Sequence, residues 1–232
     1  MTDSSRLPKL DVILLSGGSE SRFGSDVPKT FIMLKGRTLI MYPLLAFASM
    51  PFVNHIILVV GKECPLDRIA NEPIMSRVTI VQGGATRTDS VRNGLNVLSG
   101  LSDHSSYIAI HDGARPFVPT DVVQNVLLAA SECGISAPGL PLTDTVKRIS
   151  ADGIVTEHLR RTELTAIQTP QIFSYDILTE LYQHNCATSV TDDTELASLT
   201  GHSVKIVGGS RELSKLTYPE DLLFAEKMAE KY

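Results

Sequence analysis

The chain lacks the two Gly-rich phosphate-binding motifs that are most common in α/β proteins. Its first glycine pair, Gly17-Gly18, has Arg22 and Phe23 at the offsets where a Gly-x-x-x-x-Gly-Lys-Ser/Thr loop needs its second glycine. No Gly-x-Gly-x-x-Gly occurs anywhere in the sequence. These absences remove the main support for a P-loop ATPase and for a dinucleotide-dependent dehydrogenase.

Cysteine is scarce and widely spaced. The three cysteines, Cys64, Cys133 and Cys186, form no Cys-x-x-Cys pair, and the six histidines have no metal-ligand spacing. This pattern argues against a disulfide framework and a zinc site, and no residue is assigned as a metal ligand. Buried free thiols in a reducing compartment are the simpler expectation.

Basic residues are not in excess. The chain has 21 Lys and Arg against 26 Asp and Glu, a net charge of −5, so no nucleic-acid partner is expected. The N-terminal segment MTDSSRLPKLD precedes the first apolar run without a signal-peptide or lipidation pattern, and no transmembrane segment is evident. We therefore expect a cytoplasmic protein with no membrane association.

The 232 residues, 43% of them hydrophobic and 20% charged, suit one globular domain over residues 1–232. Apolar runs predict strands over residues 12–15, 55–60, 78–81, 107–110 and 135–139. Helical patterns alternate with them, the first over residues 38–50 with Thr38 as its N-cap. The alternation predicts an α/β fold of three layers with a mostly parallel sheet.

One segment breaks this alternation. Residues 145–149 and 154–159 read as two extended stretches around a Ser-Ala-Asp-Gly turn, which is a hairpin signal. We expect an arm, about residues 141–163, whose strand edges pair with a second copy to give a homodimer. The alternative is a free surface flap.

The first predicted strand leads into Ser16-Gly17-Gly18-Ser19, where small residues let backbone N–H groups approach an anion. Arg22 and Lys29 bring two cations to the same loop. A strand that ends in such a loop is how α/β proteins hold nucleotide phosphates. Alone, the loop fits equally well a Gly-rich connection with two solvated bases.

Two further loops follow predicted strands, at residues 83–90 and 111–116, and parallel strands bring such loops to one crevice. Gly83-Gly84 with Ser90 would admit a flat base, although a helix cap beside a solvated Arg87 explains the motif equally well. Asp112 could hold a magnesium–phosphate complex or a sugar hydroxyl.

Later hydroxyls and cations suit a second anionic ligand, although each alone is more simply a turn or a solvated charge. They are Thr143, Thr145, Lys147, Arg148, Arg160, Arg161, Thr169 and Lys215. The run Thr191-Asp192-Asp193-Thr194-Glu195 has the composition of a divalent-ion cluster. A capped helix N-terminus is the preferred interpretation.

Several motifs carry a family resemblance. The opening loop with Pro28-Lys29, then GGATRTDSV, HDGARP, PLTDTVKR, QTPQIF and LSKLTYPEDL occur in order. From about residue 11 onward the chain resembles the 2-C-methyl-D-erythritol 4-phosphate cytidylyltransferases of the non-mevalonate isoprenoid pathway. HDGARP and PLTDTVKR are its most specific parts.

The resemblance implies a Rossmann-like nucleotidyltransferase fold and transfer of CMP from CTP to the polyol phosphate, with Mg²⁺ and release of pyrophosphate. It implies catalytic roles for Arg22 and Lys29. The arm would form the homodimer, so Thr145 or Arg161 would serve the partner's site. The implied substrate-positioning residues are Arg161, Lys215, Thr145, Thr169, Asp112 and Arg115, and the nucleotide-binding residues are Leu15, Ser16, Gly17, Gly18, Gly84, Ser90 and Gly113.

The chain departs from the family at a few positions. The opening loop begins Ser-Gly-Gly where Ala-Ala-Gly is common, and Thr30 replaces a common Gln. Ala85 stands where many members carry an acidic residue that reads the cytosine, which shifts base recognition toward backbone groups around Gly84.

Two other functions compete with this assignment. The first is a cytidylyltransferase for ribitol 5-phosphate or another polyol phosphate; the Gly113-Ala114 and Lys147-Arg148 pairs disfavour it. The second is a non-catalytic nucleotide-binding protein on the same fold, which the joint presence of the charged motif residues disfavours.

Overall fold

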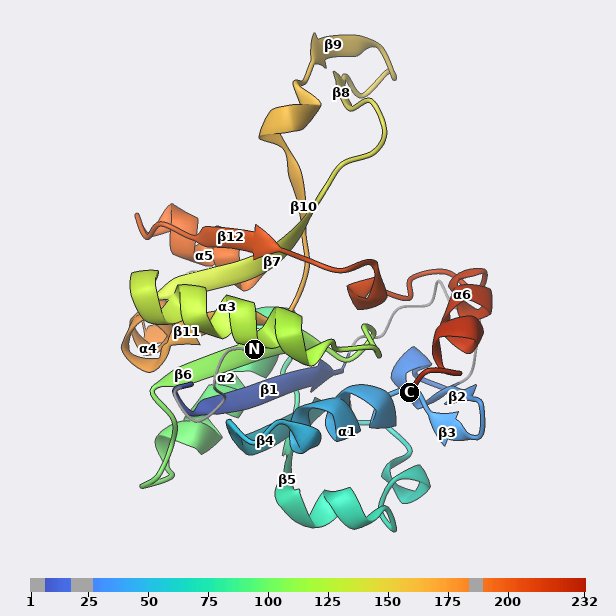
Figure 1. Cartoon of the computed structure of the whole chain (residues 1–232), viewed down its shortest axis with the longest axis vertical. Helices are drawn as coiled ribbons and strands as arrows, with labels where there is room; N and C mark the ends of the chain where they lie inside the picture. The colour runs from blue at the N-terminus through green and yellow to red at the C-terminus, as the bar shows by residue number, and fades with distance from the viewer. Residues whose placement is uncertain (1–6, 18–26, 184–189) are drawn as a thin grey trace.

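A mixed sheet of eight strands runs through the computed structural model, which describes residues 7–17, 27–183 and 190–232 (Figure 1). The order is β10-β7-β11-β6-β1-β4-β5, and β12 pairs with β7. The strands are β1 (Leu10–Ser16), β4 (Val53–Val60), β5 (Val78–Gln82), β6 (Tyr107–Asp112), β7 (Ile135–Pro141), β10 (Thr165–Ile167), β11 (Gln171–Ser174) and β12 (Lys205–Gly208). β6, β1, β4 and β5 are parallel, so the loops that follow them leave at one edge.

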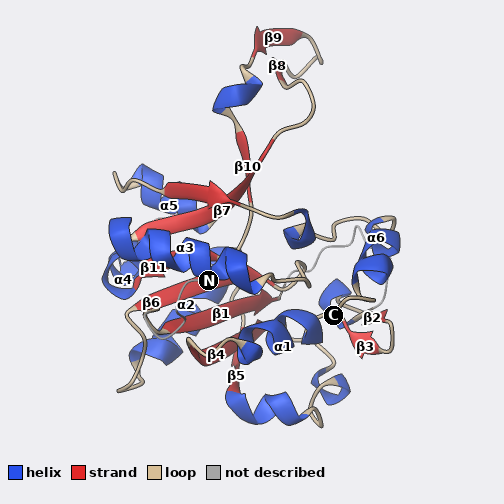
Figure 2. Ribbon diagram, in the orientation of Figure 1, coloured by secondary structure: helices blue, strands red, loops and turns tan. Residues whose placement is uncertain are grey.

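Helices cover both faces of this sheet, which gives the three-layer α/β architecture expected from the sequence (Figure 2). Alternating residues of β1 divide between the two layers. Val12 and Leu14 pack in the cluster with α1 (Met41–Ser49) and α3 (Thr120–Cys133), whereas Ile13 packs in the other. That second cluster includes α2 (Arg87–Ser99), α4 (Tyr175–Gln183) and α5 (Asp193–Leu199).

A smaller core closes one end of the molecule. There α6 (Asp221–Met228) packs near β2 (Met33–Leu34) and β3 (Arg37–Thr38), and Tyr42 and Phe117 join its hydrophobic cluster. Short 3₁₀ segments connect the larger elements. They are η3 (Lys29–Phe31), η4 (Leu66–Arg68), η5 (Pro73–Arg77), η6 (Arg161–Glu163) and η7 (Arg211–Leu213).

The arm extends away from the sheet (Figure 1). It contains the antiparallel pair β8 (Lys147–Ile149) and β9 (Val155–His158), which confirms the predicted hairpin. Its two ends lie side by side, because β10 pairs antiparallel with β7 through Thr165 and Pro141. At the tip, Ile149 and Ile154 are 60% and 66% exposed.

The structure corrects three local expectations. Thr38 does not cap a helix: it lies in β3, and α1 begins at Met41 without a side-chain cap, since the chain first makes a β2–β3 hairpin. Neither of the two described thiols is fully buried: Cys133 is exposed at the end of α3, and Cys64 is half-buried. Cys186 lies outside the described residues. β10 and β11, which no periodicity indicated, complete the sheet.

No helix in the described part of the chain is both long and apolar enough to cross a membrane.

Candidate active site

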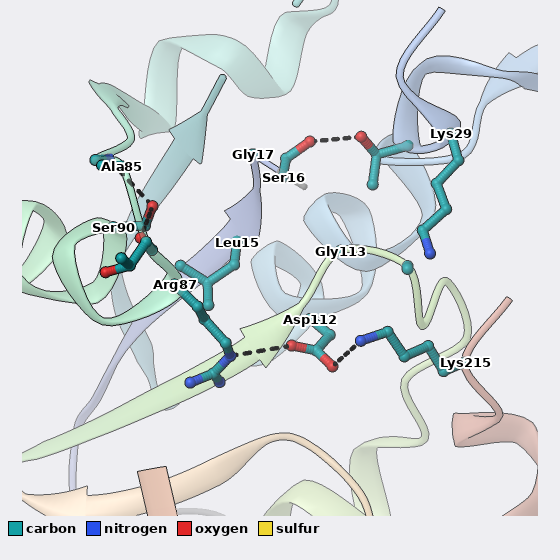
Figure 3. A pocket seen from close by; sticks show the side chains of 14 residues that line it. Leu15, Ser16, Gly17, Lys29, Ala85, Arg87, Ser90, Asp112, Gly113 and Lys215 are labelled. Carbon is teal, nitrogen blue, oxygen red and sulfur yellow. Dashed lines mark hydrogen bonds and ion pairs between the residues drawn. The ribbon is translucent and has the colours of Figure 1, made fainter. Parts of the chain in front are cut away.

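A cavity of about 290 Å³ lies at the carboxyl edge of β1 and β6 (Figure 3). The three loops that the sequence placed at one crevice line it together with two lysines. The lining residues are Leu15, Ser16, Gly17, Lys29, Thr30, Gly84, Ala85, Thr86, Arg87, Ser90, Asp112, Gly113, Ala114 and Lys215. The ends of β1, β5 and β6, the η3 segment and the segment at Lys215 thus bring residues from five separate parts of the chain to one site.

The loop after β1 is tied to its neighbours by backbone and hydroxyl groups. The Ser16 hydroxyl donates to Thr30 Oγ1 at 2.7 Å, and the Gly113 N–H donates to the Leu15 carbonyl at 2.8 Å. A Cβ on Gly113 would lie 2.8 Å from that carbonyl oxygen, so glycine is needed for this close approach. Two predicted residues of this loop, Gly18 and Arg22, lie outside the described residues.

The loop before α2 is shaped by the helix N-terminus. Thr86 and Asp89 form a capping box, in which the Thr86 hydroxyl accepts from the Asp89 N–H at 3.0 Å. Ser90 Oγ accepts from the Gly84 N–H at 3.1 Å and donates to the Thr86 carbonyl at 2.9 Å. Ser90 therefore fixes the backbone of the loop between β5 and α2.

Three cations surround the Asp112 carboxylate. Lys215 Nζ lies 3.2 Å from Oδ2, Arg115 Nε lies 3.7 Å from the same oxygen, and Arg87 Nε lies 3.9 Å from Oδ1. Figure 3 shows Arg87 and Lys215 approaching the carboxylate from opposite sides. Burial alone would raise the pKa of Asp112, but Lys215, Arg87 and Arg115 lower it to about 2. Asp112 is thus an anion in the folded protein at neutral pH.

The segment that carries Lys215 is held at several points. Arg115 donates through Nη1 to the Leu213 carbonyl at 2.7 Å, and the Leu216 N–H donates to the Ala114 carbonyl at 2.9 Å. Gln168 bonds both sides of the Ser210 backbone, donating to its carbonyl at 2.8 Å and accepting from its N–H at 3.1 Å. These contacts place an ammonium group from near the end of the chain beside Asp112.

Arg87 belongs to the site, although the sequence analysis did not place it among the site residues. Its Nη2 lies 2.7 Å from Oδ2 of Asp193, a carboxylate with no exposure, whose other oxygen accepts from the Tyr182 hydroxyl. Burial would lower the pKa of the Arg87 guanidinium, but Asp193 and Asp112 raise it. Its first-turn position in α2 was visible in the sequence, but its partner in α5 is brought close only by the tertiary fold.

Thr169 lies behind the cavity rather than in its lining. It is buried, and its hydroxyl contacts the Asp112 N–H and the His111 ring, both at 3.1 Å. Thr145 and Arg161 lie on the arm, and neither lines the cavity of its own chain. Arg161 instead donates to the Thr143 carbonyl.

The acidic run near residue 193 forms a helix cap, as preferred from the sequence. The Asp192 side chain accepts from the Glu195 N–H at 2.8 Å, and the Glu195 carboxylate accepts from the Thr191 N–H and hydroxyl at 2.7 and 2.8 Å. Among the described residues, no group of three or more His, Cys, Asp or Glu side chains is arranged to hold a metal ion.

Comparisons with known proteins agree with this geometry. The profile of the 2-C-methyl-D-erythritol 4-phosphate cytidylyltransferase family matches residues 10–231. A protein of that name from Alkaliphilus oremlandii is 35% identical and covers 96% of this chain and 95% of its own length. One from Bacillus mycoides is 37% identical, with 93% and 95% covered.

Solved structures share the fold. The crystal structure of 4-diphosphocytidyl-2C-methyl-D-erythritol synthase from Anaerococcus prevotii superposes with a TM-score of 0.80 at 26% identity, covering 96% of each chain. The 2-C-methyl-D-erythritol 4-phosphate cytidylyltransferase of Thermus thermophilus gives 0.77 at 28% identity, with 96% and 99% covered. The match along nearly the whole chain, together with the shared fold, shows that this chain belongs to the 2-C-methyl-D-erythritol 4-phosphate cytidylyltransferase family.

Proposed function

We propose that the cavity at the carboxyl edge of the sheet is the active site of a cytidylyltransferase. The family gives the reaction: CTP and 2-C-methyl-D-erythritol 4-phosphate form the cytidine-diphospho alcohol and pyrophosphate, a step of isoprenoid precursor biosynthesis. One observation supports this location most directly. Lys29, Asp112 and Lys215, which come from distant parts of the sequence, line a single cavity beside the loop at Ser16 and Gly17.

The residues suit an in-line displacement at phosphorus. A phosphate oxygen of the acceptor attacks the α-phosphorus of CTP, the bond to the bridging oxygen of pyrophosphate breaks, and pyrophosphate leaves. The attacking group is already an anion, so no strong base is needed, and catalysis rests on alignment and on neutralising charge. Lys29 would stabilise the reacting phosphates, and Lys215, held by Asp112, would orient the acceptor. We propose that Arg22 acts with Lys29.

A magnesium ion fits the residues that line the cavity. Mg²⁺ is usually held by one or two carboxylates together with substrate phosphates, and Asp112 supplies an ionised carboxylate in the cavity. When bound there with CTP, the ion would neutralise the developing charge on the phosphates. The pKa of Asp112, lowered to about 2, keeps this carboxylate ionised at neutral pH.

We further propose a homodimer formed through the arm. Ile149, Ile154 and Val155 are 60%, 66% and 47% exposed on it, and β8 and β9 form a separate two-stranded sheet with free edges. Thr145 and Arg161 would then act at the site of the partner. We also propose a cytoplasmic location, because both substrates are small charged phosphates that do not cross a hydrocarbon layer unaided. We propose no nucleic-acid partner, because the chain carries a net charge of −5.

The test is a panel of acceptors offered with CTP and Mg²⁺, with pyrophosphate release as the readout. We expect release with 2-C-methyl-D-erythritol 4-phosphate and a much slower rate with ribitol 5-phosphate or erythritol 4-phosphate. A preference for ribitol 5-phosphate would replace the acceptor named here. CTP binding without release for every acceptor would show a nucleotide-binding protein instead.

A further inference from the structure

His111 is a buried ionisable group for which the proposed reaction has no use. Its side chain has no solvent exposure and contacts the edge of Phe47, with ring centroids 5.2 Å apart. Its two ring nitrogens each have one polar partner. Nε2 lies 2.9 Å from the Arg115 carbonyl oxygen, and Nδ1 lies 3.1 Å from the Thr169 hydroxyl.

The chemistry of these partners fixes where the protons are. A carbonyl oxygen only accepts, so Nε2 must carry the proton that it donates to Arg115. The ring is fully buried, and its two polar partners are a carbonyl and a hydroxyl rather than a carboxylate, so it is neutral and Nδ1 keeps a lone pair. Thr169 therefore donates its hydroxyl proton to Nδ1, while the same oxygen accepts from the Asp112 N–H at 3.1 Å.

The result is a continuous chain of hydrogen bonds from the Asp112 N–H through Thr169 and His111 to the Arg115 carbonyl. It spans the short loop that carries Gly113 and pins backbone groups at both of its ends. The side chains of these two end residues lie 3.7 Å apart, and Asp112 holds Lys215. Since Thr169 donates to the ring and accepts from a backbone amide, its hydroxyl proton is already committed within the protein.

We propose that His111 and Thr169 act together as positioning residues that hold Asp112 and Arg115 in the arrangement that presents Lys215 to the acceptor phosphate. This inference rests on the proposed active site. Both residues then act on the reaction through Asp112 and Lys215. A shift of about 1 Å in such a group is enough to lower a rate about a hundredfold.

The test compares Thr169→Val, Thr169→Ser, His111→Phe and the double variant His111→Phe/Thr169→Val. Valine keeps the shape of threonine without the hydroxyl, so we expect kcat to fall roughly 10- to 100-fold. Serine keeps the hydroxyl and should recover most of that loss. Because the two residues belong to one chain, the double variant should be no slower than the slower single variant.

Two controls separate positioning from general damage. CTP binding, measured by calorimetry, should weaken much less than kcat falls in Thr169→Val, because the chain fixes Asp112 and Arg115 while Ser90 fixes the loop at Gly84. Thr38→Val removes a buried hydroxyl that has no hydrogen-bond partner among the described residues, and its kcat should match that of the unmodified protein.

The proposal fails if Thr169→Val keeps full kcat, if the losses of the single variants multiply in the double variant, or if CTP binding weakens as much as kcat falls. Imidazole ¹⁵N NMR tests the chain without any substrate, since Nε2 should carry the proton and Nδ1 should not. A protonated Nδ1 near pH 7 would overturn the assignment. An unmodified protein that releases no pyrophosphate would instead refute the proposed function.

Discussion

Arg87 and Asp193 form an ion pair of 2.7 Å in which the carboxylate is completely buried. The guanidinium also reaches toward Asp112, with its Nε 3.9 Å from Oδ1. One side chain at the start of α2 thus connects the candidate active site with the start of α5. Arg87 thus links α2, β6 and α5, which are far apart in the sequence. We therefore expect that its loss greatly lowers the stability of the protein.

Replacing Arg87 with Gln should destabilise the protein by about 3–5 kcal/mol, because it leaves the buried Asp193 charge without its partner. Urea unfolding monitored by circular dichroism measures this loss. The matched control is Arg92→Gln, whose pair with Asp89 has side chains 31% and 40% exposed and should contribute far less to stability. The double variant Arg87→Gln/Asp193→Asn should recover part of the loss. Equal effects of the two single Arg variants would contradict the buried-pair interpretation.

Lys29→Ala and Lys215→Ala should each lower the rate of pyrophosphate release by about a hundredfold or more, because each removes a cation from the proposed phosphate site. Lys29→Ala should change the melting temperature little, whereas Lys215→Ala should lower it, because it removes the nearest cation from the buried Asp112 carboxylate. Lys227→Ala, on the exposed face of α6, serves as the control and should keep the full rate. Near-normal turnover of Lys29→Ala would remove that residue from the mechanism.

Asp112 should make stability depend on pH in the acidic range. Its folded-state pKa of about 2 lies below the ordinary value of 3.8, so the stability it provides is complete above that value and is lost as the pH falls toward 2. Between pH 5 and pH 3 the unmodified protein should lose about 1 kcal/mol relative to Asp112→Asn. Urea unfolding of both proteins at the two pH values gives this difference, in which the other carboxylates cancel. A constant difference would mean that the three cations do not lower the pKa.

Mixing two inactive variants tests whether the arm serves the site of a partner. In a heterodimer of Lys29→Ala and Arg161→Ala, the Arg161→Ala chain keeps its own Lys29 and receives Arg161 from the other subunit. If Arg161 acts across the interface, random mixing should restore about a quarter of the unmodified rate, since half of the dimers are mixed and each has one complete site.

The same mixture should stay inactive if Arg161 acts within its own chain. Ile154→Asp on the arm should abolish the recovery by preventing dimer formation, as sedimentation would show. Leu223→Asp, at a residue 75% exposed on α6, provides the control for adding a charge to an exposed apolar position. A chain that sediments as a monomer before any substitution would contradict the dimer itself.

Patterns confined to short stretches of sequence predicted most of the fold. The apolar runs of β1, β4 and β6 are continuous because both faces of these strands are covered, and the Gly134 stop after α3 needs a residue at φ +85°. The start of α1 was predicted incorrectly because Thr38 is a common capping residue, whereas here it pairs with Met33 in a hairpin. β10 and β11 were missed because they have only three and four residues and take their stability from β7 and β6.

The candidate site likewise contains residues that local sequence patterns indicate and residues whose contacts only the tertiary fold specifies. Glycine-rich loops and charges that follow predicted strands indicated the cavity, since strand direction alone brings them to one edge. Arg87 was left out because its role depends on a carboxylate in α5, and no local pattern specifies that contact. The family resemblance implies that Thr169 positions the substrate, but no local pattern indicates the contacts that its hydroxyl makes with the Asp112 N–H and the His111 ring.

The side-chain amide of Gln168 connects the arm with the segment that carries Lys215. Gln168 follows β10 directly, and β10 is the strand by which the arm returns to the sheet. The same side chain forms two hydrogen bonds with the backbone of Ser210, which lies a few residues before Lys215. In the proposed dimer, a displacement of the arm would therefore reach the segment that carries Lys215 through the Gln168 carboxamide, so that dimer formation and acceptor binding would be coupled at this side chain.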